Sequence, residues 1–276
     1  MVCVSQSTMG VESTELEPQF WLAIDAGATR IRVAPVCFSG RAPLCGPVAV
    51  ENFDSAQGPS RVAQAASLIR LVAERAGWTP PFRVGLAWAG APSADGLGTV
   101  AARYGPAIPD LVERLGALVP LQGTPCLHSD ARAALEGAAV LYDFSSAYAL
   151  ISGSGLGEAY FDNGRSWTRE EFSLRLGRAS TWEFRGKDGE AWLRAGAWRT
   201  ERPRIFQEAL WALVSHRLEE VRPEVLALGG HFGEWFERGW VTAEEVEERW
   251  GLRLLRLEAE AALLGCVQLE RRRIGH

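Results

Sequence analysis

The chain has 276 residues, a formal net charge of −5, and a composition that is 47% hydrophobic and 23% charged. This length accommodates two lobes of ordinary domain size with a well-buried core. The acidic balance argues against a general nucleic-acid-binding role, and the sequence contains no run of about 20 apolar residues that would predict a membrane span. Lys187 is the only lysine, so no other lysine can take part in a mechanism.

Residues 1–19 are polar and mixed, without a basic region followed by a long apolar run, and they predict a disordered tail rather than a signal peptide. No C-x-x-C pair or Cys/His cluster occurs, so a structural zinc or iron–sulfur site is not expected. The odd number and scatter of the cysteines favour reduced thiols and a cytoplasmic protein. They are Cys3, Cys37, Cys45, Cys126 and Cys266.

A glycine-bearing turn follows the first apolar segment. Residues 20–25 predict a strand, residues 26–29 a turn, and residues 31–36 a returning strand. Glycine allows backbone N–H groups to approach an anion closely, and a threonine hydroxyl adds a further donor. The turn that contains Gly27 and Thr29 therefore predicts a phosphate-binding element.

Asp25 lies where this first strand ends and the turn begins. An ionised carboxylate there could hold Mg²⁺ through water, because Mg²⁺ sheds its water reluctantly. It could equally satisfy only the backbone amides of the turn. Spacing alone does not decide between these roles.

The next segments alternate between strand and helix patterns. The expected elements are a third, antiparallel strand at 46–51, a helix with Val62, Ala66, Ile69 and Ala73 on one face, a buried strand at 83–88, a helix at 107–118 and a strand at 125–128. Ser129 follows and could cap a helix at 131–139.

Asp130 follows this short strand and precedes the helix. A carboxylate that faces a cleft there could accept a proton from a hydroxyl nucleophile, a role that contributes about 10²–10⁴-fold to the rate. The alternative is that Asp130 caps the helix, which spacing alone favours.

The second half repeats the plan. Strands at 146–152 and 156–161 flank Gly153-Ser154-Gly155-Leu156-Gly157, and Asp162-Asn163-Gly164 predicts a hairpin. Two matched turns suggest two lobes that grip one polyphosphate, and the order of elements predicts an α/β fold with mixed sheets. The remaining expected elements are helices at 188–197, 203–220, 242–249 and 256–270 and a buried strand at 224–228.

Two further patterns carry weaker signals. Gly229-Gly230 follows the buried strand and could open a helix N-terminus toward a nucleotide, or simply connect strand and helix. Aromatic faces stack on sugar rings, although a place in the core is the more ordinary role for most of a nearby group of tryptophans. That group is Trp167, Trp182, Trp192 and Trp198.

Taken together, these segments resemble sugar kinases of the actin/Hsp70/hexokinase (ASKHA) superfamily, specifically the ROK type and the related N-acetylglucosamine-kinase type. Asp25, Gly27, Thr29 and Arg32 match the first phosphate motif of that family, D-x-G-x-T-x-x-R. Residues 129–137 resemble N-D-A-N-A-A-A-L-G-E, whose aspartate is the family's catalytic base.

Other segments extend the resemblance from about residue 20 to residue 268. Residues 153–157 resemble the second phosphate motif, residues 225–230 the adenosine motif, residues 85–91 a glycine-bearing strand segment, and residues 103–111 the acceptor loop. The resemblance implies that Asp130 is the catalytic base and that Asp25 is the Mg²⁺ site. It implies a nucleotide-binding site made of Gly27, Thr29, Arg32, Gly153, Ser154, Gly155, Gly229 and Gly230. It implies a sugar-binding site made of Gly90, Tyr104, Ser129 and Asp130.

The resemblance also implies an architecture. It predicts two ribonuclease-H-like lobes with mixed sheets around a central cleft, as in actin-like ATPases. Residues 20–132 would form the first lobe and residues 133–253 the second. Residues 254–276 would form a C-terminal helix that packs back on the first lobe.

Several positions depart from the ROK pattern. Glu158 stands where ROK proteins usually have a glycine, and a carboxylate there is expected to repel phosphate. Arg132 replaces an asparagine, Tyr104 occupies a place where asparagine is common, and the ROK His/Cys zinc motif is absent. Residues 186–192 are weakly similar to the G-D-E-G-S element of the N-acetylglucosamine-kinase type.

The function implied is ATP-dependent phosphorylation of a hexose or amino sugar of the glucose, N-acetylglucosamine or N-acetylmannosamine class, with ATP and Mg²⁺ as cofactors. The expected partner is a small sugar, with no nucleic acid or membrane and with a possible homodimer. The alternative is a catalytically impaired ROK-like sensor that binds a sugar or nucleotide. An activase-type ATPase would need cluster-ligating cysteines, and none is suitably placed.

Overall fold

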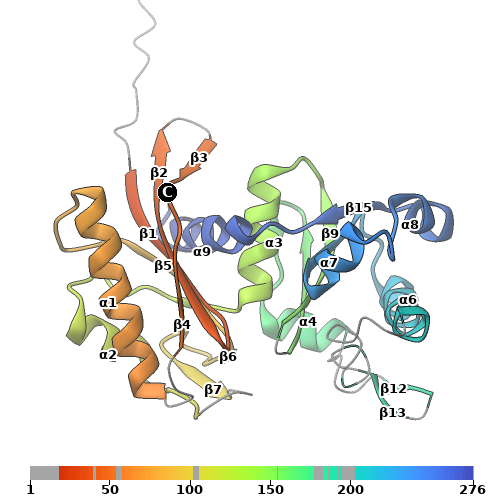
Figure 1. Ribbon diagram of the computed structural model, residues 1–276, viewed down its shortest axis with the longest axis horizontal. Helices are drawn as coiled ribbons and strands as arrows, with labels where there is room; N and C mark the ends of the chain where they lie inside the picture. Colours follow the sequence, from red (N-terminus) through yellow and green to blue (C-terminus); the bar gives the residue numbers. More distant parts are fainter. Residues whose placement is uncertain are drawn as a thin grey trace, which may run out of the picture.

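The computed structural model describes residues 19–39, 42–53, 58–101, 106–153, 155–176, 183–185, 187–189, 191, 193 and 203–275. Two α/β lobes lie side by side, with helices α3 (Asp130–Leu141) and α9 (Ala259–Arg273) between them (Figure 1). The expected α/β fold with two mixed sheets is confirmed. Within the described part of the chain, no helix combines the length and apolar character needed to cross a membrane.

The sheet of the first lobe has the order β3-β2-β1-β5-β8, with β4 also paired to β2. β1 is antiparallel to β2 and parallel to β5. The bounds are β1 (Gln19–Ala26), β2 (Arg30–Ser39), β3 (Ala42–Cys45), β4 (Ala49–Asn52), β5 (Val84–Trp88) and β8 (Leu127–His128). Helices α1 (Gly58–Ala76) and α2 (Leu111–Leu118) share one buried apolar cluster with this sheet, and β6 (Ala91–Pro92) and β7 (Thr99–Ala101) form a small ribbon.

The sheet of the second lobe has the order β11-β10-β9-β14-β15. β9 is antiparallel to β10 and parallel to β14, so the core of the first lobe's topology recurs. The strands are β9 (Ser146–Ser152), β10 (Leu156–Asp162), β11 (Arg165–Ser166), β14 (Val225–Gly230) and β15 (Arg253–Arg256). The other elements are α4 (Arg169–Leu176), β12 (Glu183–Phe184), β13 (Lys187–Asp188), α6 (Pro203–Glu220), α7 (His231–Glu237) and α8 (Ala243–Trp250).

Helices α3 and α9 cross in backbone contact. A Cβ on Gly137 would lie 1.7 Å from the carbonyl oxygen of Ala261, and one on Gly265 would lie 1.7 Å from that of Ala133. Only glycine permits such an approach. On the first-lobe side, α9 packs against β1 through a cluster that includes Trp21, Leu263 and Val267.

Most of the expected elements are confirmed, and α6 occupies the expected range of 203–220. The hairpin at Asp162-Asn163-Gly164 is also confirmed: Asp162 pairs with Arg165, and Asn163 and Gly164 have φ of 51° and 80°. The strand expected at 46–51 is instead β4, at residues 49–52. β15 and α4 lie outside the expected elements, and the last helix begins at 259 rather than 256 because β15 precedes it.

The helix expected at 107–118 is wrong in its first turn. α2 begins at Leu111. Proline disfavours helical backbone in the residue before it, and Ile108, which precedes Pro109, instead accepts a hydrogen bond from the Thr99 N–H at 2.9 Å. Most of the helix expected at 188–197 and residues 1–18 of the expected tail lie outside the described residues, whereas Gln19 already belongs to β1.

Candidate functional site

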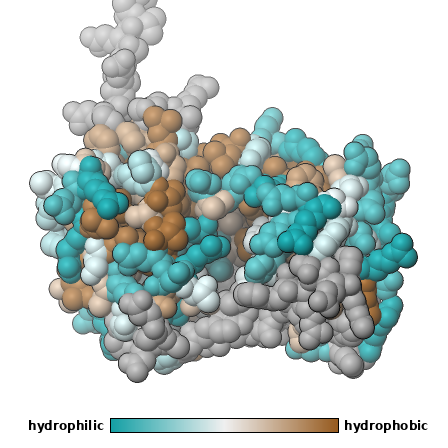
Figure 2. All heavy atoms as spheres, in the orientation of Figure 1, coloured by the Kyte–Doolittle hydropathy of each residue, from teal (hydrophilic) through white to brown (hydrophobic). Residues whose placement is uncertain are grey.

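A cavity of about 1160 Å³ lies between the lobes and takes its walls from both. In the space-filling view the surface is recessed between them (Figure 2). Every expected site residue that the structure describes lines this cavity, while Tyr104 and Ser154 lie outside the described residues. The lining residues from that set are Asp25, Gly27, Thr29, Arg32, Gly90, Ser129, Asp130, Gly153, Gly155, Gly229 and Gly230.

Arg61 of α1 contacts the first glycine turn. The guanidinium donates to the carbonyl oxygen of Gly27 and lies 4.2 Å from the ring centroid of Phe53. The turn closes on itself through a 2.9 Å hydrogen bond from the Gly27 N–H to the Arg30 carbonyl. Arg61 is 3% exposed, and burial lowers its pKa. Sequence reasoning missed this residue, because the contact joins segments 34 positions apart.

Asp25 forms an ion pair with Arg32 on the neighbouring strand, where the two residues are register partners. The Asp25 side chain is 2% exposed and the Arg32 side chain 21%. Arg32 also donates to the carbonyl oxygen of Ala259 at 3.3 Å. The first phosphate motif is thereby joined to the beginning of α9.

Asp130 is the first residue of α3, and the N-cap is Ser129, whose hydroxyl accepts from the Arg132 N–H at 3.4 Å. The interpretation of Asp130 as the helix cap is therefore wrong. Its Oδ1 accepts a 2.8 Å hydrogen bond from the Ala131 N–H. Burial, and secondarily the negative charge of Asp25, raise the pKa of Asp130 to about 6. A carboxylate of this kind is ionised at neutral pH and is a stronger base than a free aspartate.

The second glycine turn is open to the cavity. A Cβ on Gly153 would meet no atom within 4 Å, and the Gly153 N–H donates to the Gly155 carbonyl at 2.9 Å. Beneath it, Gly230 has φ of 61°, and a Cβ there would lie 2.1 Å from the carbonyl oxygen of Ser152. Glycine is required at 230 by both conformation and space. Gly229-Gly230 joins β14 directly to the short helix α7.

Glu158 does not present a free carboxylate. Its Oε1 lies 2.9 Å from Nε of Arg217 and accepts from the Tyr148 hydroxyl at 2.7 Å. The Glu158 and Arg217 side chains are 7% and 2% exposed. The charge is compensated inside the second lobe, which removes the reason to expect repulsion of a phosphate.

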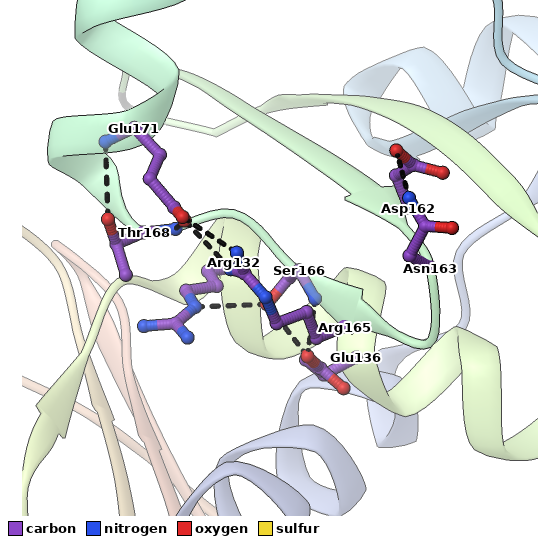
Figure 3. Close-up of polar contacts among 8 residues, drawn as sticks. All are labelled: Arg132, Glu136, Asp162, Asn163, Arg165, Ser166, Thr168 and Glu171. Atoms are coloured by element: carbon purple, nitrogen blue, oxygen red, sulfur yellow. Dashed lines mark hydrogen bonds and ion pairs between the residues drawn. The ribbon is translucent and has the colours of Figure 1, made fainter.

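A polar network continues from α3 to the hairpin β10–β11 (Figure 3). Nε of Arg132 donates to the Ser166 hydroxyl at 2.9 Å, and the Ser166 N–H and hydroxyl donate to Glu136 at 2.7 and 2.8 Å. Arg272 of α9 lies 2.9 Å from the fully buried Glu136 carboxylate. Sequence reasoning missed Glu136, whose one local signal is an acid flanked by the apolar segments of α3.

The residues present fit a magnesium–nucleotide complex. The described residues contain no cluster of three or more His, Cys, Asp or Glu side chains that could hold a metal ion. Mg²⁺ typically binds through one or two carboxylates together with water and substrate phosphates, and Asp25 and Asp130 are two such carboxylates on one cavity. The buried Ser152 hydroxyl, also in the cavity wall, has no hydrogen-bond partner among the described residues, so a polar ligand group would satisfy it.

No known family profile matches the sequence, and no curated protein does either. Solved structures do match. A ROK family glucokinase from Streptomyces griseus, in complex with glucose and AMPPNP, superposes with a TM-score of 0.66 at 15% identity, over 92% of this chain and 100% of that one. The chain has the fold of the ROK sugar kinases.

Two other matching structures show that proteins of this fold differ in function. A ROK hexokinase from Thermus thermophilus has a TM-score of 0.63 at 21% identity, over 93% of this chain and 99% of that one. A ROK family transcriptional regulator, a homolog of the E. coli MLC protein, has a TM-score of 0.60 at 13% identity, over 91% of this chain and 78% of that one. Kinases and regulators therefore share this architecture, and function must be argued from the cavity.

Proposed function

We propose that this protein is a ROK-type kinase that transfers a phosphoryl group from ATP to a hydroxyl of a hexose or amino sugar. The observation that carries the proposal is the placement of Asp130. Its carboxylate lines the cavity between the two glycine turns, does not cap its helix, and has a pKa of about 6. These are the properties of a general base for a hydroxyl nucleophile.

In this proposal the sugar hydroxyl attacks the γ-phosphorus and passes its proton to Asp130, while the bond to the bridging oxygen breaks and ADP leaves. The Oδ2 atom would take the proton, because Oδ1 already accepts from the Ala131 N–H. Asp25 would hold Mg²⁺, which supplies positive charge against the phosphates. Closure of the lobes would exclude water.

The other expected site residues would bind the nucleotide and the sugar. The nucleotide would bind at Gly27, Thr29, Arg32, Gly153, Ser154, Gly155, Gly229 and Gly230, and the sugar at Gly90, Tyr104 and Ser129. We also propose the division into lobes at residues 20–132 and 133–253 with a C-terminal segment at 254–276, although α3 spans the first boundary.

The test is Asp130→Asn in an ADP-release assay over glucose, mannose, N-acetylglucosamine, N-acetylmannosamine and glucosamine. A base acts mainly in the transition state, so we expect kcat to fall by about 10²-fold or more while nucleotide affinity is retained. Asp110→Asn is the matched control, since Asp110 lies outside the cavity at the beginning of α2. A wild-type rate in the Asp130 variant would contradict the proposed mechanism.

A second candidate is a sensor that binds a sugar or nucleotide without turnover. The Asp25–Arg32 ion pair favours it, because a carboxylate engaged by arginine is less available to a metal. Calorimetry separates the candidates: binding of a sugar and Mg·ATP by a wild-type protein that releases no ADP would support the sensor.

A further inference from the structure

The cavity wall beside Asp130 carries a cation. Arg132 lies two residues after the proposed base, is half-buried and lines the cavity. Its Nε is engaged by Ser166, and in Figure 3 the two terminal nitrogens point away from Ser166 and from the rest of the network. The side of the guanidinium that carries these nitrogens is thus left for another partner.

The network holds this guanidinium in place. Ser166 and Glu136 are both fully buried, and Ser166 donates twice to Glu136 while it accepts from Arg132. Arg272 then fixes Glu136 from α9. An arginine held at one nitrogen by a buried, saturated network loses little further freedom when its other nitrogens bind a ligand.

The two acids nearest to Arg132, Glu136 and Glu171, are both engaged by other groups. Within the ranges that the structure describes, no carboxylate forms an ion pair with Arg132. Glu136 already binds Ser166 and Arg272, and Glu171 already accepts from Arg165 at 2.7 and 2.8 Å and from the Thr168 N–H at 2.7 Å. Burial lowers the pKa of Arg132, and the negative charges of Glu136 and Glu171 offset this effect only in part.

We propose that Arg132 binds an anionic group of the acceptor, so that the acceptor is a sugar that carries a carboxylate or a phosphate. This inference rests on the proposed kinase function and names its substrate class. The terminal nitrogens of a guanidinium match the two oxygens of a carboxylate or phosphate. The neighbouring wall, formed by Trp167, Thr168 and Ser173, offers an aromatic surface and hydroxyls suited to the rest of a sugar.

The test compares glucose with two anionic relatives, glucuronate for the carboxylate and glucose 6-phosphate for the phosphate. Binding to the wild-type protein is measured by calorimetry, which requires no turnover, and ADP release is measured in parallel. We expect at least one anionic sugar to bind about tenfold or more tightly than glucose. The sugar that shows the preference identifies which anion the site takes.

The decisive variant is Arg132→Asn, which removes the cation and should abolish the preference. Arg132→Lys, which keeps the charge without the planar fork, should retain only part of it. The control is Arg114→Gln, because Arg114 is 45% exposed, pairs with Asp110 in the first lobe and does not line the cavity. This control should keep the wild-type preference.

Two results would overturn the inference. One is wild-type protein that binds neither anionic sugar more tightly than glucose, a result that does not depend on any variant folding. The other is an unchanged preference in Arg132→Asn. A preference that requires Arg132 in a protein that releases no ADP with any acceptor would support the inference while contradicting the proposed kinase function.

Discussion

The two lobes share a strand plan but present different chemistry to the cavity. In each sheet an antiparallel hairpin, β1–β2 or β9–β10, is followed by parallel strands. The first lobe brings charged groups to the cavity wall: Asp25 and Arg32 beside its glycine turn and Arg61 beneath it. Beside its own glycine turn the second lobe has Ile151 and the backbone of Gly153 and Gly229, and its charged lining residues, such as Glu234 and Arg256, lie on α7 and β15.

The difference between the two turns comes from single residues at equivalent positions of the two lobes. Asp25 precedes its turn glycine, Gly27, by two residues, and Ile151 precedes Gly153 by the same spacing. The second lobe does contain a strong ion pair, Glu158–Arg217, but its carboxylate and guanidinium are almost fully buried. One backbone plan therefore carries charged side chains beside the glycine turn of the first lobe and an apolar side chain beside that of the second.

The largest expected effect tests whether the Glu158–Arg217 ion pair stabilises the core of the second lobe. Arg217→Met removes the cation that pairs with the buried Glu158 carboxylate, so the free energy of unfolding should fall by about 3–5 kcal/mol. Urea denaturation measures this change. Arg165→Met, which removes an exposed pair, should cost about 1 kcal/mol or less.

The double variant Glu158→Met with Arg217→Met sharpens the same comparison. Replacement of both charges by apolar groups should recover most of the lost stability, because no unpaired charge remains. If Glu158 belongs to the core, Mg·ATP affinity should stay near that of the wild type. A large change in that affinity would place Glu158 at the phosphates instead.

The second effect separates two glycines within one lobe. Gly230→Ala should lower the free energy of unfolding by about 3 kcal/mol, since φ is 61° and the new Cβ would strike the Ser152 carbonyl. Gly153→Ala meets no atom within 4 Å and should leave stability nearly unchanged while weakening nucleotide binding. Equal stability losses in denaturation experiments would contradict this distinction.

The smallest effect concerns the pH response of the cavity. The pKa of Asp130 is raised to about 6 in the folded protein, so the folded state holds this proton more tightly than the unfolded state. The contribution of Asp130 to stability is therefore most favourable below about pH 4 and falls as pH rises to 6, by on the order of 2 kcal/mol.

Urea denaturation between pH 4 and 7 should show this slope in the wild type and not in Asp130→Asn, which would be the more stable protein at pH 7. The rate of phosphoryl transfer should rise with pH through about 6, as the base ionises. Parallel stability profiles for the two proteins would show that Asp130 is not destabilised by its surroundings.

Local patterns predicted what depends on local interactions. The apolar strand before Gly27, the hairpin at Asn163-Gly164 and the helix that begins after Ser129 each follow from a few adjacent residues. β15 has the sequence Arg-Leu-Leu-Arg, which is too short and too charged to predict a strand. It becomes one because its backbone pairs with β14.

The same limit applies to the candidate site. The residues on the two turns and Asp130 could be found from motif order, because each motif is continuous in the sequence. Arg61, Arg217 and Arg272 could not, since their partners lie 34, 59 and 136 positions away. Tertiary packing decides which charges pair with one another, and the spacing of residues in the sequence does not predict these pairs.

The crossing of α3 and α9 also sets the order in which the chain can finish folding during synthesis. β1 and β2 leave the ribosome early, yet the face of their sheet that carries Trp21 and Val36 is covered by α9, almost the last segment to be translated. A nascent or truncated chain that stops before residue 259 exposes this apolar face, the kind of surface that favours aggregation and engages chaperones. The N-terminal lobe is thus completed by the C-terminus.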